Sequence, residues 1–383
     1  MRIVYCLNSI TEGGGIASVT VTKANALSDV PGNEIFICVS DHEDNSLLTK
    51  KLSSKVNLID LNIDYYKDDW KSKLHVLKGI VIKRIKHRKR LKKHLKEINP
   101  DIVISVGLCE KYLLPKIKGS AKIIREFHSP KNYRLLLSNN KWDCIKAYIE
   151  NIYDYKWKVK RYDQIVVLTE KDRALNWQDY KNVISIPNPV SFSSNKKSLL
   201  TNKKIITIGR LTNEKNQASI IRAFATVTSV YPDWMLEIYG EGVLKKDLQK
   251  LIENKGLTDL IKIMGNTSNS QEVYSESSIF VLTSRFEGFG LVILEAMACG
   301  LPVVSYDCPY GPRNIVTDGV DGFLVPFGDE KNLAEKISFL IEHPEIRKKM
   351  GEAAIEKSKN YTLDKIIPLW MKLFESLISN NIC

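Results

Sequence analysis

The chain has 383 residues, of which 44% are hydrophobic and 26% charged, a composition that suits two folded α/β domains and excludes a disordered chain. No apolar run approaches the ~20 residues that cross a bilayer, and the opening MRIVYCLNS predicts a strand instead of a secretory signal. Seven scattered cysteines without a Cys-x-x-Cys pair favour reduced thiols over disulfides or zinc. We therefore expect a cytoplasmic protein.

The net charge of +13 is unevenly distributed along the chain. Residues 1–190 hold 34 Lys and Arg against 21 Asp and Glu, whereas residues 191–383 hold 23 of each. Because the whole imbalance lies in the first half, the two halves are expected to meet different partners.

Short apolar, β-branched runs alternate with longer amphipathic stretches, a pattern typical of repeated βα units and parallel sheets. The strands expected in the first half are 2–7, 34–40, 56–61, 101–107, 122–128 and 164–169. Those expected in the second half are 203–211, 234–240, 261–265, 278–284, 302–307 and 322–327. Pro187, Asn188 and Pro189 disfavour helix and begin a loop-like boundary between the halves. The segment 361–378 reads as one amphipathic helix.

A glycine-rich turn, Glu12-Gly13-Gly14-Gly15, follows the first strand. Consecutive glycines let the backbone approach a ligand closely and lead into a helix N-terminus, although a simple tight turn is the alternative. The dinucleotide-binding fingerprint is not met, because position 18 is serine; Asp41 alone keeps a nicotinamide site open.

The segment 83–96 is strongly basic, with nine Lys or Arg and two His in fourteen residues. An apolar stripe predicts a helix there; its members are Leu77, Val81, Ile85, Leu91, Leu95 and Ile98. Such a helix suits anionic lipid headgroups. Nucleic acid is the competing partner, but no nucleic-acid module and no interleaved aromatic residue is present. A merely solvated helix face is the remaining alternative.

His128 closes the strand 122–128 in the sequence REFHSP. Open α/β sheets bind ligands at the carboxyl ends of their strands, which makes this histidine a candidate catalytic residue. A structural histidine is the alternative.

The sequence GRLTNEKN follows the first strand of the second half and carries Arg210 and Lys215. The planar fork of arginine and the point charge of lysine are the groups expected around a diphosphate. The alternative is a solvated loop with two ordinary surface charges.

The segment RFEGFGLVILE, residues 285–295, follows the strand 278–284. Its turn opens a helix whose free amides, at Gly288, Phe289, Gly290 and Leu291, would attract phosphate. Glu287 would compete with that phosphate if it only capped the helix, so it makes better sense as an acceptor for sugar hydroxyls. Glu295, about two turns further on, could reach a second hydroxylated group. A capping glutamate and a surface glutamate are the alternative.

Two motifs are absent from the sequence. No Asp-x-Asp triplet exists to hold a metal–diphosphate complex, and no Gly-x-x-x-x-Gly-Lys-Ser/Thr sequence marks a P-loop. We therefore expect no metal and no cofactor, with Arg210, Lys215 and helix amides supplying the positive field.

Taken together, the motifs resemble the family 4 glycosyltransferases over nearly the whole chain. The resemblance is carried by GRLTNEKN, IMGN, SRFEGFGLVILEAMACGLPVVSYD and GVDGFLVPFGD. It implies an α/β protein of the GT-B fold, with two Rossmann-like parallel-sheet domains facing across a cleft. It also implies retention of the anomeric configuration without an essential metal.

The resemblance also implies a division of the chain. Residues 1–188 would form an acceptor-binding domain, 189–202 a linker and 203–360 a nucleotide-sugar-binding domain. Residues 361–383 would carry a helix that crosses back to pack on the first domain.

Carried over by position, the family's donor site maps onto residues of both halves. Arg210 and Lys215 would hold the donor diphosphate, helped by the amides of residues 288–291. Glu287 would contact the donor sugar and Glu295 the ribose. The remaining implied contacts are those of Met264 with the nucleobase, Gly14 and Gly15 with phosphate, and His128 with the region of the sugar.

SYDCPYGPRNIV, which spans Asp307 to Arg313, resembles the subgroup that makes bacterial capsule, exopolysaccharide and lipopolysaccharide. The expected function is transfer of a hexose or N-acetylhexosamine from a nucleotide-sugar, with UDP favoured over GDP. The expected acceptor is lipid-linked or a saccharide, reached from the inner face of the cytoplasmic membrane. A sugar-nucleotide epimerase of the same fold and a non-catalytic nucleotide-sugar-binding protein are the alternatives.

Overall fold

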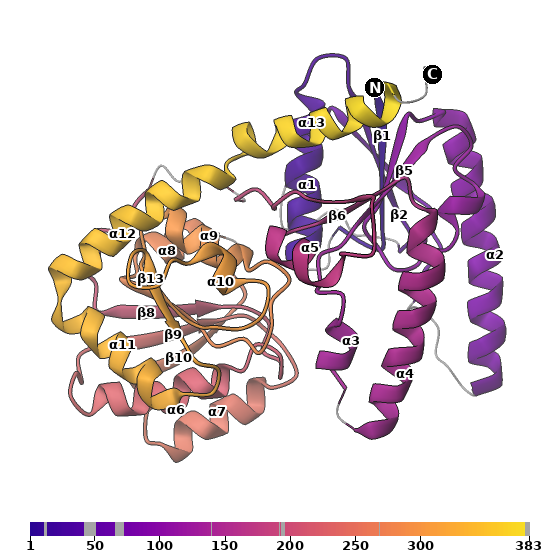
Figure 1. Ribbon diagram of the computed structural model, residues 1–383. Helices are drawn as coiled ribbons and strands as arrows, with labels where there is room; N and C mark the ends of the chain where they lie inside the picture. Colours follow the sequence, from indigo (N-terminus) through magenta and orange to yellow (C-terminus); the bar gives the residue numbers. More distant parts are fainter. Residues whose placement is uncertain are drawn as a thin grey trace. The chain divides into compact units, whose positions relative to one another are not determined.

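A computed structural model describes residues 1–10, 14–41, 51–65, 73–138, 140–190, 192, 196–267 and 269–379, with residues 73–78 described by their backbone alone. The chain divides into two compact units (Figure 1). Unit 1 comprises Met1–Pro189 and Leu363–Cys383, and unit 2 comprises Val190–Thr362.

Unit 1 is built on a seven-stranded parallel sheet with the order β3-β2-β1-β4-β5-β6-β7. Its strands are β1 (Arg2–Leu7), β2 (Glu34–Val39), β3 (Val56–Asp60), β4 (Ile102–Ser105), β5 (Lys122–Glu126), β6 (Gln164–Val167) and β7 (Val183–Ser185). Six of these strands confirm the runs predicted from sequence. β7 was missed, because only three residues separate its start from the Pro187 region taken as linker.

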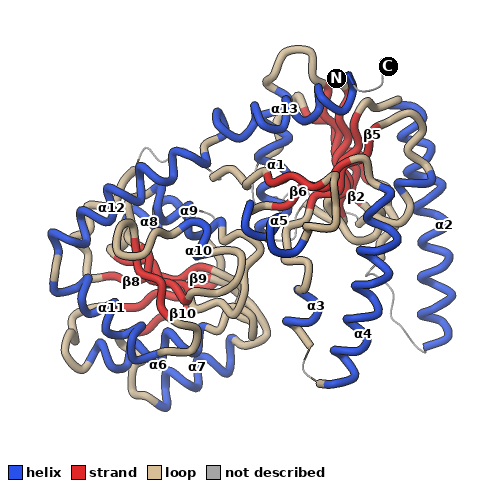
Figure 2. Tube along the Cα trace, in the orientation of Figure 1, coloured by secondary structure: helices blue, strands red, loops and turns tan. Residues whose placement is uncertain are grey.

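The helical segments of unit 1 cover both faces of this sheet (Figure 2). They are α1 (Gly15–Ser28), α2 (Lys73–Ile98), η2 (Leu114–Lys116), α3 (Tyr133–Leu136), α4 (Lys141–Asn151), η3 (Ile152–Lys158), η4 (Val159–Arg161), α5 (Glu170–Asn176) and α13 (Leu363–Ser379). Ile3 and Tyr5 of β1 face a core with α1 and α13, whereas Val4 and Cys6 face a core with α2. Alternate residues of one strand therefore serve two buried faces, as in a doubly wound sheet.

Unit 2 is built on a six-stranded parallel sheet with the order β10-β9-β8-β11-β12-β13. Its strands are β8 (Lys204–Ile208), β9 (Met235–Tyr239), β10 (Ile261–Gly265), β11 (Ile279–Leu282), β12 (Val303–Tyr306) and β13 (Gly322–Val325). All six confirm strands predicted from sequence.

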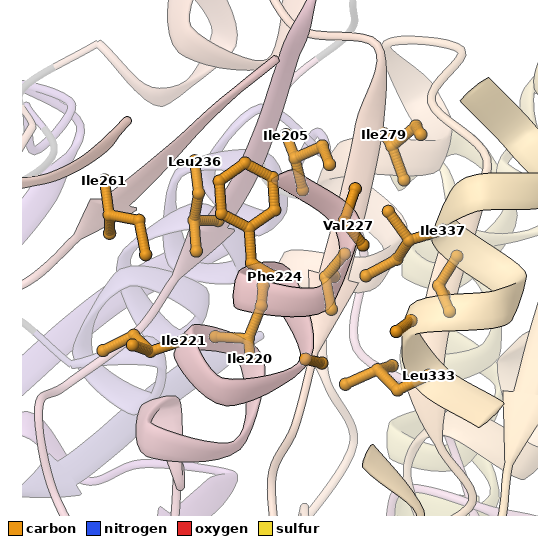
Figure 3. Packing of buried hydrophobic residues seen from close by; sticks show 14 of the residues in the cluster. Ile205, Ile220, Ile221, Phe224, Val227, Leu236, Ile261, Ile279, Leu333 and Ile337 are labelled. Carbon is orange, nitrogen blue, oxygen red and sulfur yellow. The ribbon is translucent and has the colours of Figure 1, made fainter. Parts of the chain in front are cut away.

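The helical segments of unit 2 follow the strands in turn. They are α6 (Gln217–Thr228), α7 (Lys245–Asn254), α8 (Ser270–Ser275), α9 (Leu291–Ala298), α10 (Pro312–Ile315), α11 (Glu330–Glu342), α12 (Pro344–Ser358) and η5 (Lys359–Tyr361). Figure 3 shows the core on one side of the sheet, where Phe224 of α6 is fully buried beside Leu236 and Ile205.

Both sheets share one feature of topology that locates a ligand site. The first strand of each unit lies in the middle of its sheet, and the connections wind away from it in opposite directions: β1 neighbours β2 and β4, and β8 neighbours β9 and β11. In open α/β sheets, ligands bind outside the carboxyl ends of the strands at this switch point. A ligand site is therefore expected at the loops after β1 and β4 in unit 1, and at the loops after β8 and β11 in unit 2.

Candidate active site

In unit 2, hydrogen bonds join the loops after β8 and β11 at the switch point. The amide of Arg285 donates to the carbonyl of Glu214 at 2.8 Å, and the hydroxyl of Thr283 donates to the carbonyl of Asn216 at 2.9 Å. Asn216, in the left-handed conformation with φ 51°, turns the chain into α6. These bonds hold the two predicted motifs against each other.

Lys215 and Glu287 meet at this junction. The Nζ atom of Lys215 lies 2.6 Å from Oε1 of Glu287, and the Ser284 hydroxyl donates to the same oxygen at 2.7 Å. The Glu287 side chain is 8% exposed and that of Lys215 is 21% exposed. The charged groups are thus largely desolvated but remain reachable, the setting in which a lysine contributes most to binding an anion.

Gly311 makes room for the Glu287 side chain. A Cβ atom at position 311 would lie 2.5 Å from the Glu287 Cβ, so only glycine leaves that carboxylate where it is. Ser284 and Gly311 were not among the residues predicted from sequence. Ser284 stands three residues before Glu287 inside the recognised motif, which is the signal that could have found it.

Two glycines, Gly240 and Gly242, let the loop after β9 approach the loop after β8. A Cβ at Gly240 would lie 2.0 Å from the Gly209 carbonyl oxygen, and one at Gly242 would lie 2.4 Å from the Leu211 carbonyl oxygen. Both residues have positive φ, 141° and 159°. The Gly-x-Gly sequence after a strand was the available signal, and sequence analysis missed it.

Arg210 lies in the same loop as Lys215 but is not in the ion pair with Glu287. Its guanidinium contacts Oε1 of Glu214 at 3.3 Å, and its side chain is 67% exposed. Its carbonyl accepts a hydrogen bond of 2.8 Å from the Gln217 side chain, which fixes the loop backbone. The backbone is held while the guanidinium remains accessible to a ligand.

Helix α9 begins at Leu291, with Gly290 as its N-cap at φ 90°. Among the described residues, the amides of Gly288 to Leu291 donate to no backbone carbonyl outside the helix. Free amides at a helix N-terminus and in the turn before it are a favourable place for an anion. Phe289 is buried and its ring lies 5.9 Å from that of Tyr361, which anchors the turn.

Glu295 and Met264 stand apart from the ion pair. The hydroxyl of Tyr274 on α8 donates to Oε2 of Glu295 at 3.2 Å, so this carboxylate has a partner within unit 2. Met264 is the next-to-last residue of β10, two strands from β8, and is 48% exposed.

Cys308 is close enough to feel the charges of the ion pair, and Arg313 lies in the loop that carries Gly311. Burial raises the pKa of the Cys308 thiol, and the charge of Glu287 raises it further, which disfavours the nucleophilic thiolate. Arg313 forms a bidentate ion pair with Asp307 at 2.7 and 2.8 Å, which braces the loop that carries Gly311.

Unit 1 carries the remaining predicted residues. Gly14, with extended backbone, is the N-cap of α1, and Gly15 is its first residue. No acidic residue lies in the first turn of this helix. Glu12 and Gly13 fall outside the described residues.

His128 follows β5, and its side chain is 5% exposed. Its Nε2 atom lies 3.2 Å from Oε1 of Glu126, which in turn forms a fully buried ion pair with Lys23 of α1. Burial opposes ionisation of Glu126, but the charges of Lys23 and His128 outweigh it and lower the pKa of this carboxyl to about 2. The Lys23 ammonium also lies 4.5 Å from the centre of the Trp370 ring on α13. His128 is therefore held by a charged cluster that reaches the last helix.

The basic segment 83–96 lies on α2, as predicted. The predicted apolar stripe is only partly buried: Leu91 and Leu95 are in the core, whereas Val81 and Ile85 are 55% and 64% exposed. Apolar and basic side chains are therefore both accessible on this part of the helix. No helix within the described ranges combines the length and apolar character needed to cross a membrane.

Comparison with known proteins adds a family assignment. The family model "Glycosyl transferases group 1" matches residues 191–357. A Methanocaldococcus jannaschii protein called an uncharacterized glycosyltransferase is 30% identical over 356 residues, covering 77% of this chain and 84% of the relative.

A second relative is the poly(ribitol-phosphate) alpha-N-acetylglucosaminyltransferase of Staphylococcus aureus. It is 28% identical over 291 residues, which cover 71% of this chain and 59% of the relative. A further relative is 36% identical over 224 residues but is matched over only 24% of its own length. The chain thus spans only part of some of the curated proteins that it matches.

Among solved structures, a mutant of S. aureus TarM in complex with Fondaparinux, alpha-GlcNAc-glycerol and UDP superposes with a TM-score of 0.78. The alignment is 18% identical and covers 97% of this chain and 99% of that chain, so it bears on the fold. With its two Rossmann-like sheets and the similarities above, the chain is a glycosyltransferase of the GT-B fold and belongs to the group 1 glycosyl transferases.

Proposed function

We propose that the protein transfers a hexose or N-acetylhexosamine from a UDP-sugar to a lipid-linked or saccharide acceptor in the synthesis of a cell-surface polysaccharide. The observation that carries the proposal is the contact between Lys215 and Glu287 at the switch point of unit 2, 2.6 Å from nitrogen to oxygen. UDP in the TarM complex supports the choice of nucleotide, and the polymer named for the S. aureus relative supports the class of acceptor.

The ion pair explains how one site holds both parts of the donor. A diphosphate at this loop would compete with Glu287 for the Lys215 ammonium, since its negative charge is larger. Glu287 would then be free to accept hydrogen bonds from sugar hydroxyls, while Ser284 keeps it oriented. Arg210 and the amides at the start of α9 would complete the phosphate contacts.

The remaining contacts are proposed from position. Glu295 would reach the ribose, exchanging or sharing its bond from Tyr274. The backbone around Met264 would contact the base. Gly14 and Gly15 would present the N-terminus of α1 to phosphate, and His128 would lie near the sugar.

The reaction would break the bond between the anomeric carbon and the donor phosphate through an oxocarbenium-like state. Negative charge develops on the leaving diphosphate, so cations fixed there lower the barrier most. We propose attack by the acceptor hydroxyl on the face that the diphosphate leaves, with a phosphate oxygen taking the proton, and hence retention of configuration. The positive field comes from side chains and amides, so a chelator should leave the rate unchanged.

The test is a transfer assay on Lys215→Ala and Glu287→Ala. Each is expected to lower transfer by about 10²–10³-fold, because each removes a contact to charge that develops in the transition state. The matched control is Lys331→Ala, which should retain full activity. Lys331 lies on α11, and its side chain is 88% exposed. Near-normal transfer by both site variants would refute the assignment.

Donor and reaction class are separated by two measurements. A screen of nucleotide-sugars should raise the melting temperature only with the true donor, since a ligand that binds the native state stabilises it. An epimerase would convert this donor without any acceptor, and a binding-only protein would be stabilised but would turn over nothing.

We also propose that α2 brings the protein to an anionic membrane face. The exposed Ile82 and Ile85 accompany exposed Arg84 and Arg88 on this helix, a combination that suits the lipid headgroup region. Sedimentation with anionic vesicles should fall when Lys89, Arg90, Lys92 and Lys93 are replaced by serine; unchanged sedimentation would end this proposal.

A further inference from the structure

Unit 1 contains a cavity of about 300 Å³ with a strongly cationic lining. It is bordered by the middle of α2, by the segment after β4 and by η3. The segment after β4 begins at the carboxyl edge of the sheet, and β4 is one of the two strands that flank the switch point of unit 1. One wall of the cavity is therefore the segment that leaves the carboxyl end of β4, the kind of segment that binds ligands in this type of fold.

Four basic side chains line the cavity: Arg84, Arg88, Lys116 and Lys158. No carboxylate is among the lining residues, and within the described parts of the chain none of the four forms an ion pair. Arg84 and Arg88 are one helical turn apart, and like charges at this spacing destabilise a helix. An anion between them would remove that repulsion.

A buried carboxylate on η3, one of the segments that border the cavity, is already neutralised. Asp154 of η3 accepts hydrogen bonds from Lys111 at 2.8 Å, from Arg134 and from Tyr112. Lys111 and Arg134 lie outside the cavity lining, so Asp154 is balanced without the four cavity cations. The positive charge of the cavity remains available to a ligand.

The aromatic wall of the cavity holds one cation in place. The Lys158 ammonium lies 4.7 Å from the centre of the Tyr153 ring, and Tyr153 packs edge-on against Tyr112 with ring centres 5.9 Å apart. Cys109 also lines the cavity, and burial raises the pKa of its thiol to about 12, so it adds no negative charge. Nothing in the lining opposes an anion.

From these observations we infer that the cavity binds a phosphate-bearing acceptor, gripping a phosphodiester or pyrophosphate group close to the hydroxyl that receives the sugar. The inference rests on the proposed transferase function. The volume is at the lower end of small-molecule sites, enough for one or two phosphates with part of a polyol or sugar. Four cations offer more positive charge and more hydrogen-bond donors than one carboxylate can match, which favours a phosphodiester or pyrophosphate group.

The first experiment measures binding of inorganic pyrophosphate to the full-length protein by calorimetry, with UDP present in excess to occupy the donor site. The wild-type protein is expected to bind. The variant Arg84→Gln/Arg88→Gln should bind at least about tenfold more weakly, because it loses two charged forks. Lys171→Gln/Lys181→Gln, which removes two exposed charges from the same unit outside the cavity, should bind as wild type. No binding by the wild type, or equal loss in both variants, overturns the inference.

The second experiment separates an acceptor from a membrane headgroup. With a phosphate-containing acceptor, Arg84→Gln/Arg88→Gln should raise the acceptor KM about tenfold and leave the donor KM unchanged. Sedimentation with vesicles containing phosphatidylglycerol should fall equally for this variant and for Lys89→Gln/Lys92→Gln. A selective loss of vesicle binding in the cavity variant, with acceptor KM unchanged, would assign the cavity to lipid and overturn the inference.

The outcomes for the two proposals are distinct. If the wild type transfers no sugar to any acceptor but the cavity variant loses pyrophosphate binding, the transferase proposal fails while the anion site remains. If transfer depends on Lys215 and Glu287 but the cavity variant behaves as wild type, the acceptor site fails alone.

Discussion

Each unit has a lysine–glutamate ion pair between distant segments, and the two pairs differ in exposure. Lys23 and Glu126 of unit 1 are both fully buried, whereas Lys215 and Glu287 of unit 2 are 21% and 8% exposed at the side chain. A fully buried pair has no route to a ligand and acts on its surroundings, here His128 and Trp370. A partly exposed pair can exchange one partner for a substrate. The same two residue types therefore hold neighbouring side chains in place in unit 1 and are available to bind a substrate in unit 2.

The largest effect is expected from breaking the buried pair. Lys23→Met should lower the free energy of unfolding by about 3–5 kcal/mol, because it leaves the buried Glu126 carboxylate with His128 as its remaining charged partner. Urea denaturation followed by circular dichroism measures the change. The double variant Lys23→Met/Glu126→Gln should recover part of the loss.

The matching change in unit 2 is Lys215→Met. This variant should destabilise less than Lys23→Met, by about 1–3 kcal/mol, since Glu287 is not fully buried and keeps the hydrogen bond from the Ser284 hydroxyl. A loss as large as that of Lys23→Met would show that both pairs are structural and would remove the contrast.

Acid should affect the buried pair in a defined direction. The pKa of Glu126 is lowered to about 2 from an ordinary 4.5, so its stabilising contribution is complete above about pH 4.5 and is lost as the pH falls through about 2. The wild type should lose up to about 3 kcal/mol more than the double variant between about pH 5 and pH 2. Parallel pH profiles for the two proteins would contradict this assignment.

The addition of one methyl group at position 311 tests whether the position of the Glu287 carboxylate matters for transfer. Gly311→Ala would place a methyl group 2.5 Å from the Glu287 Cβ and displace the carboxylate. We expect a loss of about tenfold in transfer, because misplacing a positioning group weakens catalysis more than folding. Gly319→Ala is the control; its new Cβ meets nothing within 4 Å, although its positive φ makes it slightly strained. Equal activity of the two variants would mean that Glu287 tolerates displacement.

Sequence patterns predicted most of the fold because central parallel strands are continuous β-branched runs, as in β1 and β12. β7 escaped because three residues give no period and two prolines follow closely. Lys215 and Glu287 were each recognised from local motifs, but their contact joins positions 72 residues apart and depends on strand order.

Lys23 gave no signal in the sequence. It is one lysine within a helix, and its partner Glu126 lies 103 residues away. The cationic cavity was only half visible: the basic run on α2 was recognised, but Lys116 and Lys158 come from separate segments that only the folded sheet brings to it. Local sequence patterns do not encode contacts between distant segments, so these contacts could not be predicted from the sequence.

Helix α13 has a consequence for synthesis of the chain. Ile366, Trp370 and Phe374 complete a core otherwise formed by the first 189 residues, with all of unit 2 inserted between them in the sequence. During translation, therefore, the second unit emerges in full before the first can close its hydrophobic interior. The nascent protein must keep that surface from aggregating for the time needed to add about 180 residues, roughly 10–40 s at ordinary elongation rates.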